Sequence, residues 1–223
     1  GRADIVTASQ VGMARSRLWQ KNYTAAASLA QSVASDFVFT AEYSGNDPAQ
    51  YNLIYGETHG VGYFRRFTVG DGTAHKHAFE KYPFFDEWIR QGLMRRGDAD
   101  AGEVAMDPEV PLVLQLLYDN QGGTMVLASG WEARMIEAEA LLRAGSLAAA
   151  EDMINTLLTS DQSSNPMKQV NSKLPLLPFA PVDFTGDLSV DLLELGRARA
   201  SGLWMTGSRI TTLRRFLDDG LDL

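Results

Sequence analysis

Two stretches of this chain match each other at a constant offset of 124 residues. Residues 4–34 and 131–158 each carry apolar side chains at helical spacing on both sides of a short break, which is typical of a helical hairpin. The matching positions hold mostly small residues, namely Ala14, Leu18, Tyr23, Ala25 and Ala26 in the first stretch and Ala138, Leu142, Leu147, Ala149 and Ala150 in the second. Because one hairpin cannot bury its own apolar face, the pattern predicts two stacked, tetratricopeptide-like hairpins.

Turn residues divide each helical stretch in two. Lys21-Asn22 separates the first pair of helices. In the second pair, Gly145 suits the left-handed position past a helix end, and Ser146 suits the N-cap of the next helix. A further helical region is predicted over residues 188–217, with a turn at Gly207-Ser208. The predicted fold class is therefore mainly α.

An aromatic-rich insertion lies between the two predicted hairpins. Residues 37–88 hold 13 of the 21 aromatic side chains, together with many glycines. Their periodicity is poor, which predicts loops and short elements over about 37–128, with one strand near 61–69. So many aromatic side chains argue against disorder, and long irregular insertions in compact proteins are usually functional. We therefore expect the ligand site in this insertion.

Composition excludes several kinds of chemistry. The chain has 223 residues, no cysteine and a formal net charge of −8. Disulfides, a thiolate nucleophile and Cys-type zinc sites are thus ruled out, and the acidic balance disfavours nucleic acid as a partner. No apolar run approaches the ~18–20 residues of a membrane-spanning helix, and the first residues do not form a signal peptide.

Four segments resemble one known protein family. Residues 128–145 read ASGWEARMIEAEALLRAG, and residues 197–216 read RARASGLWMTGSRITTLRRF. They resemble the "EARLIEAEALLRAG" helix and the C-terminal "ERARELWLTG-R-DLRRF" stretch of SusD/RagB-type outer-membrane glycan-binding lipoproteins. Shorter similarities occur at 36–44 and at 107–111, which is similar to a "DPRVP" element. The order and spacing of the four segments fit the family.

The sequence departs from the family pattern in the last helical region. Gly196 stands where the family usually has Glu, and Ser201-Gly202 replaces a helix-favouring pair. Glycine in a helix interior costs roughly 1 kcal/mol relative to alanine, so we expect a kinked or shortened helix there. Family members are also usually much longer. The resemblance therefore predicts that an N-terminal half, with a signal peptide and a lipidated cysteine, precedes Gly1.

The resemblance implies a single SusD-like α-helical domain over residues 1–223 and a non-enzymatic function. Family members capture oligosaccharides or polysaccharides for a SusC-like TonB-dependent transporter at the surface of the cell outer membrane. Membrane attachment would come only through the lipid anchor upstream of this chain. No cofactor is expected.

Candidate ligand-binding residues come from the aromatic-rich insertion. Sugar rings stack on flat aromatic faces, and neighbouring polar groups fix their hydroxyls. Tyrosine and tryptophan suit half-exposed positions better than phenylalanine, because their rings carry a polar group. The predicted ligand-binding residues are Tyr51, Asn52, Tyr55, Tyr82 and Trp88. The alternative is that these aromatic rings pack the loops onto the helices.

Two acidic or histidine-containing segments resemble metal sites only weakly. His75 and His77 lie in a glycine-containing segment, and a structural zinc ion wants four ligands. Asp98, Asp100 and Glu109 match three positions of a calcium loop, but the glycine that such a loop requires is Glu103. We therefore predict exposed loops and no metal ligands, and an irregular calcium site at the acidic segment is the open alternative.

Two other functions stay open at this level. A glycan-active hydrolase would need paired carboxylates, and the region 57–109 offers Glu57, Asp86, Glu87, Asp107 and Glu109. A helical-repeat module that binds only proteins is the second alternative. Arg209, Arg214 and Arg215 near the C-terminus are interpreted as complementing the dipole of the last helix.

Overall fold

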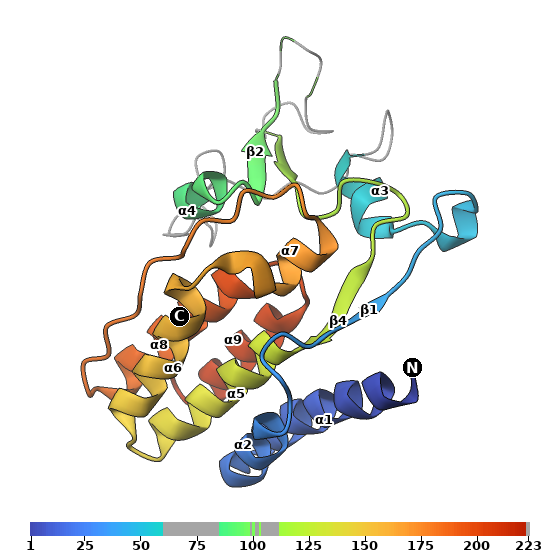
Figure 1. Ribbon diagram of the computed structural model, residues 1–223. Coiled ribbons are helices and arrows are strands. Elements are labelled where there is room, and N and C mark those ends of the chain that lie inside the picture. Colours follow the sequence, from blue (N-terminus) through green and yellow to red (C-terminus); the bar gives the residue numbers. More distant parts are fainter. Residues whose placement is uncertain (60–84, 99, 101–102, 104–111, 222–223) are drawn as a thin grey trace. The chain divides into compact units, whose positions relative to one another are not determined.

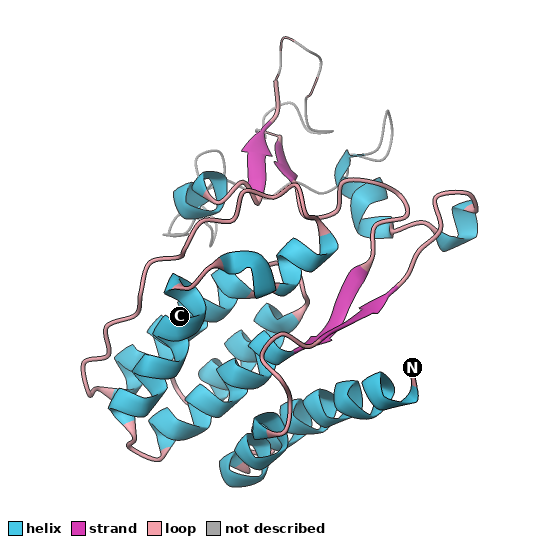
Figure 2. Ribbon diagram, in the orientation of Figure 1, coloured by secondary structure: helices cyan, strands magenta, loops and turns pink. Residues whose placement is uncertain are grey.

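The chain forms two compact units in the computed structural model (Figure 1). Unit 1 comprises residues 1–40, 126–169 and 177–223, and unit 2 comprises residues 41–125 and 170–176. The structure describes residues 1–59, 85–98, 100, 103 and 112–221. Helices dominate these residues and the strands are few and short (Figure 2), so the prediction of a mainly α protein is confirmed.

Helices build most of unit 1. They are α1 (Arg2–Trp19), α2 (Tyr23–Gln31), α5 (Gly130–Arg143), α6 (Leu147–Thr159), η2 (Gln162–Ser164), α7 (Pro166–Val170), α8 (Leu188–Gly202) and α9 (Ser208–Asp218). The strands β1 (Val38–Ala41) and β4 (Met125–Ser129) pair in a two-stranded sheet. Both predicted hairpins are thus helix pairs, α1 with α2 and α5 with α6. No helix of the described residues is long and apolar enough to span a membrane.

Local signals set the ends of these helices. The Asn22 side chain accepts a hydrogen bond from the backbone N–H of Ala25, and Ser129 does the same for Glu132, so both residues cap a helix. Gly145 has a φ of +78°, as the turn after α5 was predicted to require. Ser146 occupies the N-cap position of α6, although its side chain makes no capping hydrogen bond.

Helix α5 is the centre of unit 1, because α1, α2, α6 and α8 all contact it. Small and branched side chains fill the space between α1, α2 and α5: Val11, Ala14, Leu18, Ala26, Ala30, Val33, Ala128, Ala133 and Ile136. At Gly130, a Cβ atom would lie 1.9 Å from the carbonyl oxygen of Ala34. Glycine therefore lets α5 start directly against the chain that leaves α2.

The glycines of α8 make room for aromatic rings. Helix α8 runs unbroken from Leu188 through Gly196 and ends at Gly202. A Cβ at Gly196 would lie 2.9 Å from the ring of Phe216, and one at Gly202 would lie 3.1 Å from the ring of Trp131. The low helix propensity of these glycines is offset by ring packing that a larger residue would block.

Unit 2 consists of short elements around a small apolar core. It contains η1 (Pro48–Gln50), α3 (Leu53–His59), α4 (Phe85–Arg90), β2 (Met94–Arg96) and β3 (Val113–Gln115). Strands β2 and β3 pair antiparallel, with Met94 opposite Gln115. Buried apolar side chains include Trp88, Leu93, Met94, Leu117 and Tyr118. The strand predicted near 61–69 lies outside the described residues.

Candidate functional site

The predicted ligand residue Asn52 is used inside unit 2. Its side chain is almost completely buried. Its Oδ1 accepts hydrogen bonds from the backbone N–H groups of Ile54 (3.0 Å) and Tyr55 (3.3 Å), while Nδ2 donates to the carbonyl of Gly123 (2.8 Å). Asn52 thus caps α3 and ties it to a loop. Since its polar atoms already have partners, it is not available to a ligand in this conformation.

Tyr51 and Tyr55 are both partly exposed at α3. The ring of Tyr55 stacks on the ring of His59, with centroids 5.1 Å apart and an angle of 10° between their planes. One face of Tyr55 is therefore covered by the imidazole. Leu53, between the two tyrosines, is highly exposed. We call Tyr51, Leu53 and Tyr55 the α3 surface.

His59 is a site residue that the sequence interpretation missed. Its Nδ1 lies 3.0 Å from the hydroxyl of Thr58 and 3.2 Å from Nε2 of Gln115. Gln115 is itself held in place, since it donates to the carbonyl of Tyr118 (2.9 Å) and accepts from the N–H of the same residue (2.8 Å). This buried network fixes the imidazole and, through stacking, orients Tyr55. No spacing rule links residue 59 to residue 115, so no signal in the sequence could reveal this contact.

The prediction for Trp88 does not fit the structure. Trp88 has 3% of its surface exposed and belongs to the core of unit 2. A tryptophan ring is among the largest apolar groups a small unit can bury, and its burial here outweighs a role at the surface. It offers no face to a sugar in this conformation. Tyr82 lies outside the described residues.

The carboxylates proposed for a hydrolase are only partly described. Glu87 is held by its neighbours: Arg90 donates to both of its oxygens, at 2.8 and 2.7 Å, and Gln91 donates at 2.9 Å. Glu57 on α3 is half-buried. The side chain of Asp86, and Asp107 and Glu109 as a whole, lie outside the described residues. Of the five candidate carboxylates, the structure therefore describes only the side chains of Glu57 and Glu87.

The acidic loop after β2 forms an ion pair. Arg95 donates to both carboxylate oxygens of Glu103, at 2.5 and 2.7 Å, and the N–H of Asp98 donates to the same carboxylate at 3.0 Å. Among the residues that the structure describes, no group of three acidic or histidine side chains could hold a metal ion. His75, His77 and Glu109 lie outside them.

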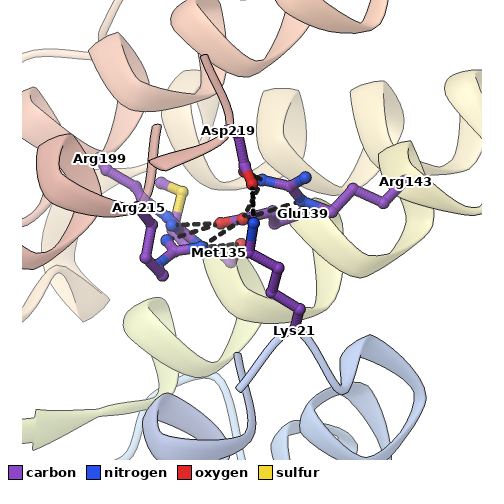
Figure 3. Close-up of polar contacts among 7 residues, drawn as sticks. All are labelled: Lys21, Met135, Glu139, Arg143, Arg199, Arg215 and Asp219. Carbon is purple, nitrogen blue, oxygen red and sulfur yellow. Dashed lines mark hydrogen bonds and ion pairs between the residues drawn. The ribbon is translucent and has the colours of Figure 1, made fainter. Parts of the chain in front are cut away.

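Unit 1 contains a buried charged cluster that the sequence did not predict (Figure 3). Its centre is Glu139 on α5, which has no exposed surface. Arg199 on α8 donates to Oε2 at 2.6 Å, and Arg215 on α9 donates to both oxygens. Arg143, one helical turn further along α5, donates to Oε1 at 3.1 Å. One carboxylate thus joins three helices.

The cluster extends to the surface through Asp219. Arg143 donates to Asp219 at 2.6 Å, and Lys21 from the turn between α1 and α2 donates to the same carboxylate at 2.6 Å. We call these six residues the Glu139 cluster: Lys21, Glu139, Arg143, Arg199, Arg215 and Asp219. Arg215, which we interpreted as a complement to a helix dipole, is instead a buried partner of Glu139.

The charges of the Glu139 cluster do not cancel. Four cations surround two carboxylates, so a positive excess remains in a mostly buried volume. Burial alone would raise the pKa of Glu139, but the arginines outweigh it and hold that pKa at about 2. Burial, together with the charge of Arg215, lowers the pKa of Arg199. Glu139 stays ionised at neutral pH and acts as a structural anion.

Comparison with known proteins gives no match: no family model, no curated protein and no solved structure is similar to this chain at the level required. The similarity to SusD/RagB proteins consequently depends on the quoted sequence runs alone.

Proposed function

We propose that this chain is a non-catalytic glycan-capture protein of an outer-membrane nutrient-uptake system that works with a SusC-like TonB-dependent transporter. One observation carries the proposal. The two longest runs that resemble the family, 128–145 and 197–216, meet in the fold, because Glu139 from the first run pairs with Arg199 and Arg215 from the second. Charged residues that the two runs share with the family motifs are therefore paired with each other in the fold.

In the proposed protein, a pair of tetratricopeptide-like hairpins forms the scaffold. Supporting it, Ala14 and Ala138 are both fully buried, as are Ala26 and Ala150, at positions that match by the offset of 124. Helix α5 contacts both α1 and α2, as the first helix of a following repeat does in such stacks. Residues 131–158 would thus be the second repeat.

The α3 surface is the proposed glycan contact. Tyr51 precedes α3 in extended conformation and Tyr55 lies in the first turn of α3. Both rings are partly exposed, and the C–H faces of pyranose rings pack on such rings. The network behind Tyr55 fixes its orientation before a ligand arrives, which reduces the entropy that binding would cost. Asn52 and Trp88 would contribute by holding this region together and would not touch the sugar.

Isothermal titration calorimetry with a panel of neutral oligosaccharides tests the proposal. We expect binding to at least one of them, and a loss of at least about tenfold in affinity when Tyr51 and Tyr55 are both changed to alanine, because stacking contributes roughly 0.5–1.5 kcal/mol per ring. Gln50→Ala is the matched control, since Gln50 is exposed next to the same surface. No binding by the folded protein to any oligosaccharide would contradict the proposal.

Two observations distinguish the proposed capture function from the hydrolase and from the protein-interaction module. A hydrolase would release reducing ends from the same oligosaccharides, and removal of one carboxylate would stop that release. A protein-interaction module would bind no glycan. The latter has one structural feature in its favour, since Ile5, Val6 and Met13 on α1 are well exposed apolar residues. In a capture protein, such a surface would instead face the transporter.

A further inference from the structure

Unit 1 contains an open cavity of about 390 Å³ between α1, α5, α8 and α9. This volume lies in the range of small-molecule sites. Three kinds of residue line the cavity: the buried arginines Arg199 and Arg215, the aromatic Trp19, and apolar residues that include Leu18 and Ile136. It lies next to the Glu139 cluster and does not include the α3 surface.

The cationic part of the lining has unused donors. Arg199 donates from its two terminal nitrogens to Glu139 and to the carbonyl of Met135, and Arg215 donates from its two terminal nitrogens to Glu139. A guanidinium has five N–H donors. Neither Nε–H has a hydrogen-bond partner within the described residues. Two buried cations share one carboxylate, so this end of the cavity attracts an anion.

The other two charged residues of the lining form an ion pair with each other. Arg15 donates to both oxygens of Glu132, and both residues line the cavity. The net positive charge of the lining therefore comes from Arg199 and Arg215. The lowered pKa of Arg199 agrees with this picture, because burial and the charge of Arg215 both work against its protonated form. An anionic oxygen in the cavity would relieve that repulsion.

Trp19 supplies the flat apolar surface. It is the last residue of α1 and has 46% of its surface exposed, which is unusual for so large an apolar side chain. Ser16 and Gln20 lie beside it in the lining. The hydroxyl of Ser16 donates to the carbonyl of Gly12 and can still accept. The amide oxygen of Gln20 accepts from Arg17, and its amide N–H groups have no partner within the described residues. The cavity thus combines a ring platform, hydroxyl-binding groups and a carboxylate-binding end.

We infer that this cavity is a binding site for a hexuronate, a pyranose that carries one carboxylate. The carboxylate would accept from the Nε–H groups of Arg199 and Arg215, and the pyranose ring would pack on Trp19, leaving its hydroxyls to Ser16 and Gln20. The choice of a sugar acid among ring-shaped carboxylates rests on the proposed function. The site would extend that function from neutral sugars to acidic ones.

Titration of the whole chain with D-glucuronate and D-galacturonate, followed by calorimetry or by ligand-observed NMR, tests this inference. We expect at least one of them to bind, at least about tenfold more tightly than D-glucose or acetate, because each of the latter lacks one of the two recognised groups. Affinity should also fall as salt rises from low to physiological concentration. No binding of either hexuronate would overturn the inference, and so would equal binding of glucose or of acetate.

Two variants on α1 locate the site. Trp19→Ala should weaken hexuronate binding by about tenfold, through the loss of ring packing. Met13→Ala is the matched control: Met13 is a similarly exposed apolar residue of the same helix and does not line the cavity. Both positions are exposed, so both variants should fold, which thermal unfolding can verify. Unchanged binding by Trp19→Ala would overturn the inference.

The hexuronate test can succeed or fail independently of the oligosaccharide test of the proposed function. The double variant of Tyr51 and Tyr55 should keep its affinity for the hexuronate, since neither residue lines the cavity. If neutral oligosaccharides fail to bind while a hexuronate binds and needs Trp19, the cavity is established and the α3 surface is not. The reverse result leaves the α3 surface as a glycan site and overturns the cavity.

Discussion

Helices α1 and α5 hold matching positions in the two hairpins, yet their surroundings differ. Helix α1 buries one stripe of residues, Val11, Ala14 and Leu18, and packs chiefly on α2 and α5. Helix α5 is covered on several sides and buries even Glu139. The position in α1 that matches Glu139 is Arg15, whose side chain is 46% exposed. The same local pattern can thus yield a surface helix or a central helix, depending on what packs around it.

The largest effect should come from removing the central carboxylate. Glu139→Ala leaves Arg143, Arg199 and Arg215 near each other without their shared anion, which should cost about 3–5 kcal/mol of unfolding free energy. The midpoint of urea unfolding measures this. Arg15→Ala at the matching position is the control, and it should cost at most about 1 kcal/mol, because its ion pair with Glu132 is partly exposed. Similar losses for the two variants would contradict the contrast between α5 and α1.

Acid should weaken the protein through the same residue. The folded-state pKa of Glu139 is about 2, below its ordinary value of 4.5. Its contribution to stability is therefore complete above about pH 5 and is lost as pH falls toward 2. A shift of this size corresponds to about 3 kcal/mol. Urea unfolding between pH 5 and pH 2.5 should show a shallower decline for Glu139→Gln than for the original protein. Equal slopes would show that other carboxylates dominate acid unfolding.

Replacing either of two glycines by alanine should change the free energy of unfolding by a smaller amount, and in opposite directions. Gly130→Ala places a methyl group against the carbonyl of Ala34 at the start of α5, so we expect a loss of about 1–3 kcal/mol. Gly12 lies inside α1, and a Cβ there would meet no described atom within 4 Å. Gly12→Ala should therefore stabilise the protein by about 0.5–1 kcal/mol through higher helix propensity. Thermal unfolding of both variants measures the difference, and destabilisation by Gly12→Ala would mean that α1 is more enclosed than the structure shows.

The candidate sites were predictable only in part. Tyr51 and Tyr55 were predicted from their residue type, and the structure leaves both partly exposed. Trp88 was predicted by the same argument from residue type, but it lies in the core. Residue type alone does not distinguish a buried ring from an exposed ring that can bind a ligand. Trp19 is the converse case: it is exposed beside a cavity, and nothing in its neighbourhood in the sequence marks it as a ligand residue.

The sequence by itself determined the helices and their turns, because spacing within a few residues and residues such as Asn22, Ser129 and Gly145 act locally. Only the tertiary structure decided which residues meet across the helices. Glu139 reaches Arg199 and Arg215 over 60 and 76 residues of chain. Such a pairing depends on how α5, α8 and α9 pack, and no periodicity records it. The cavity and its positive charge follow from that packing.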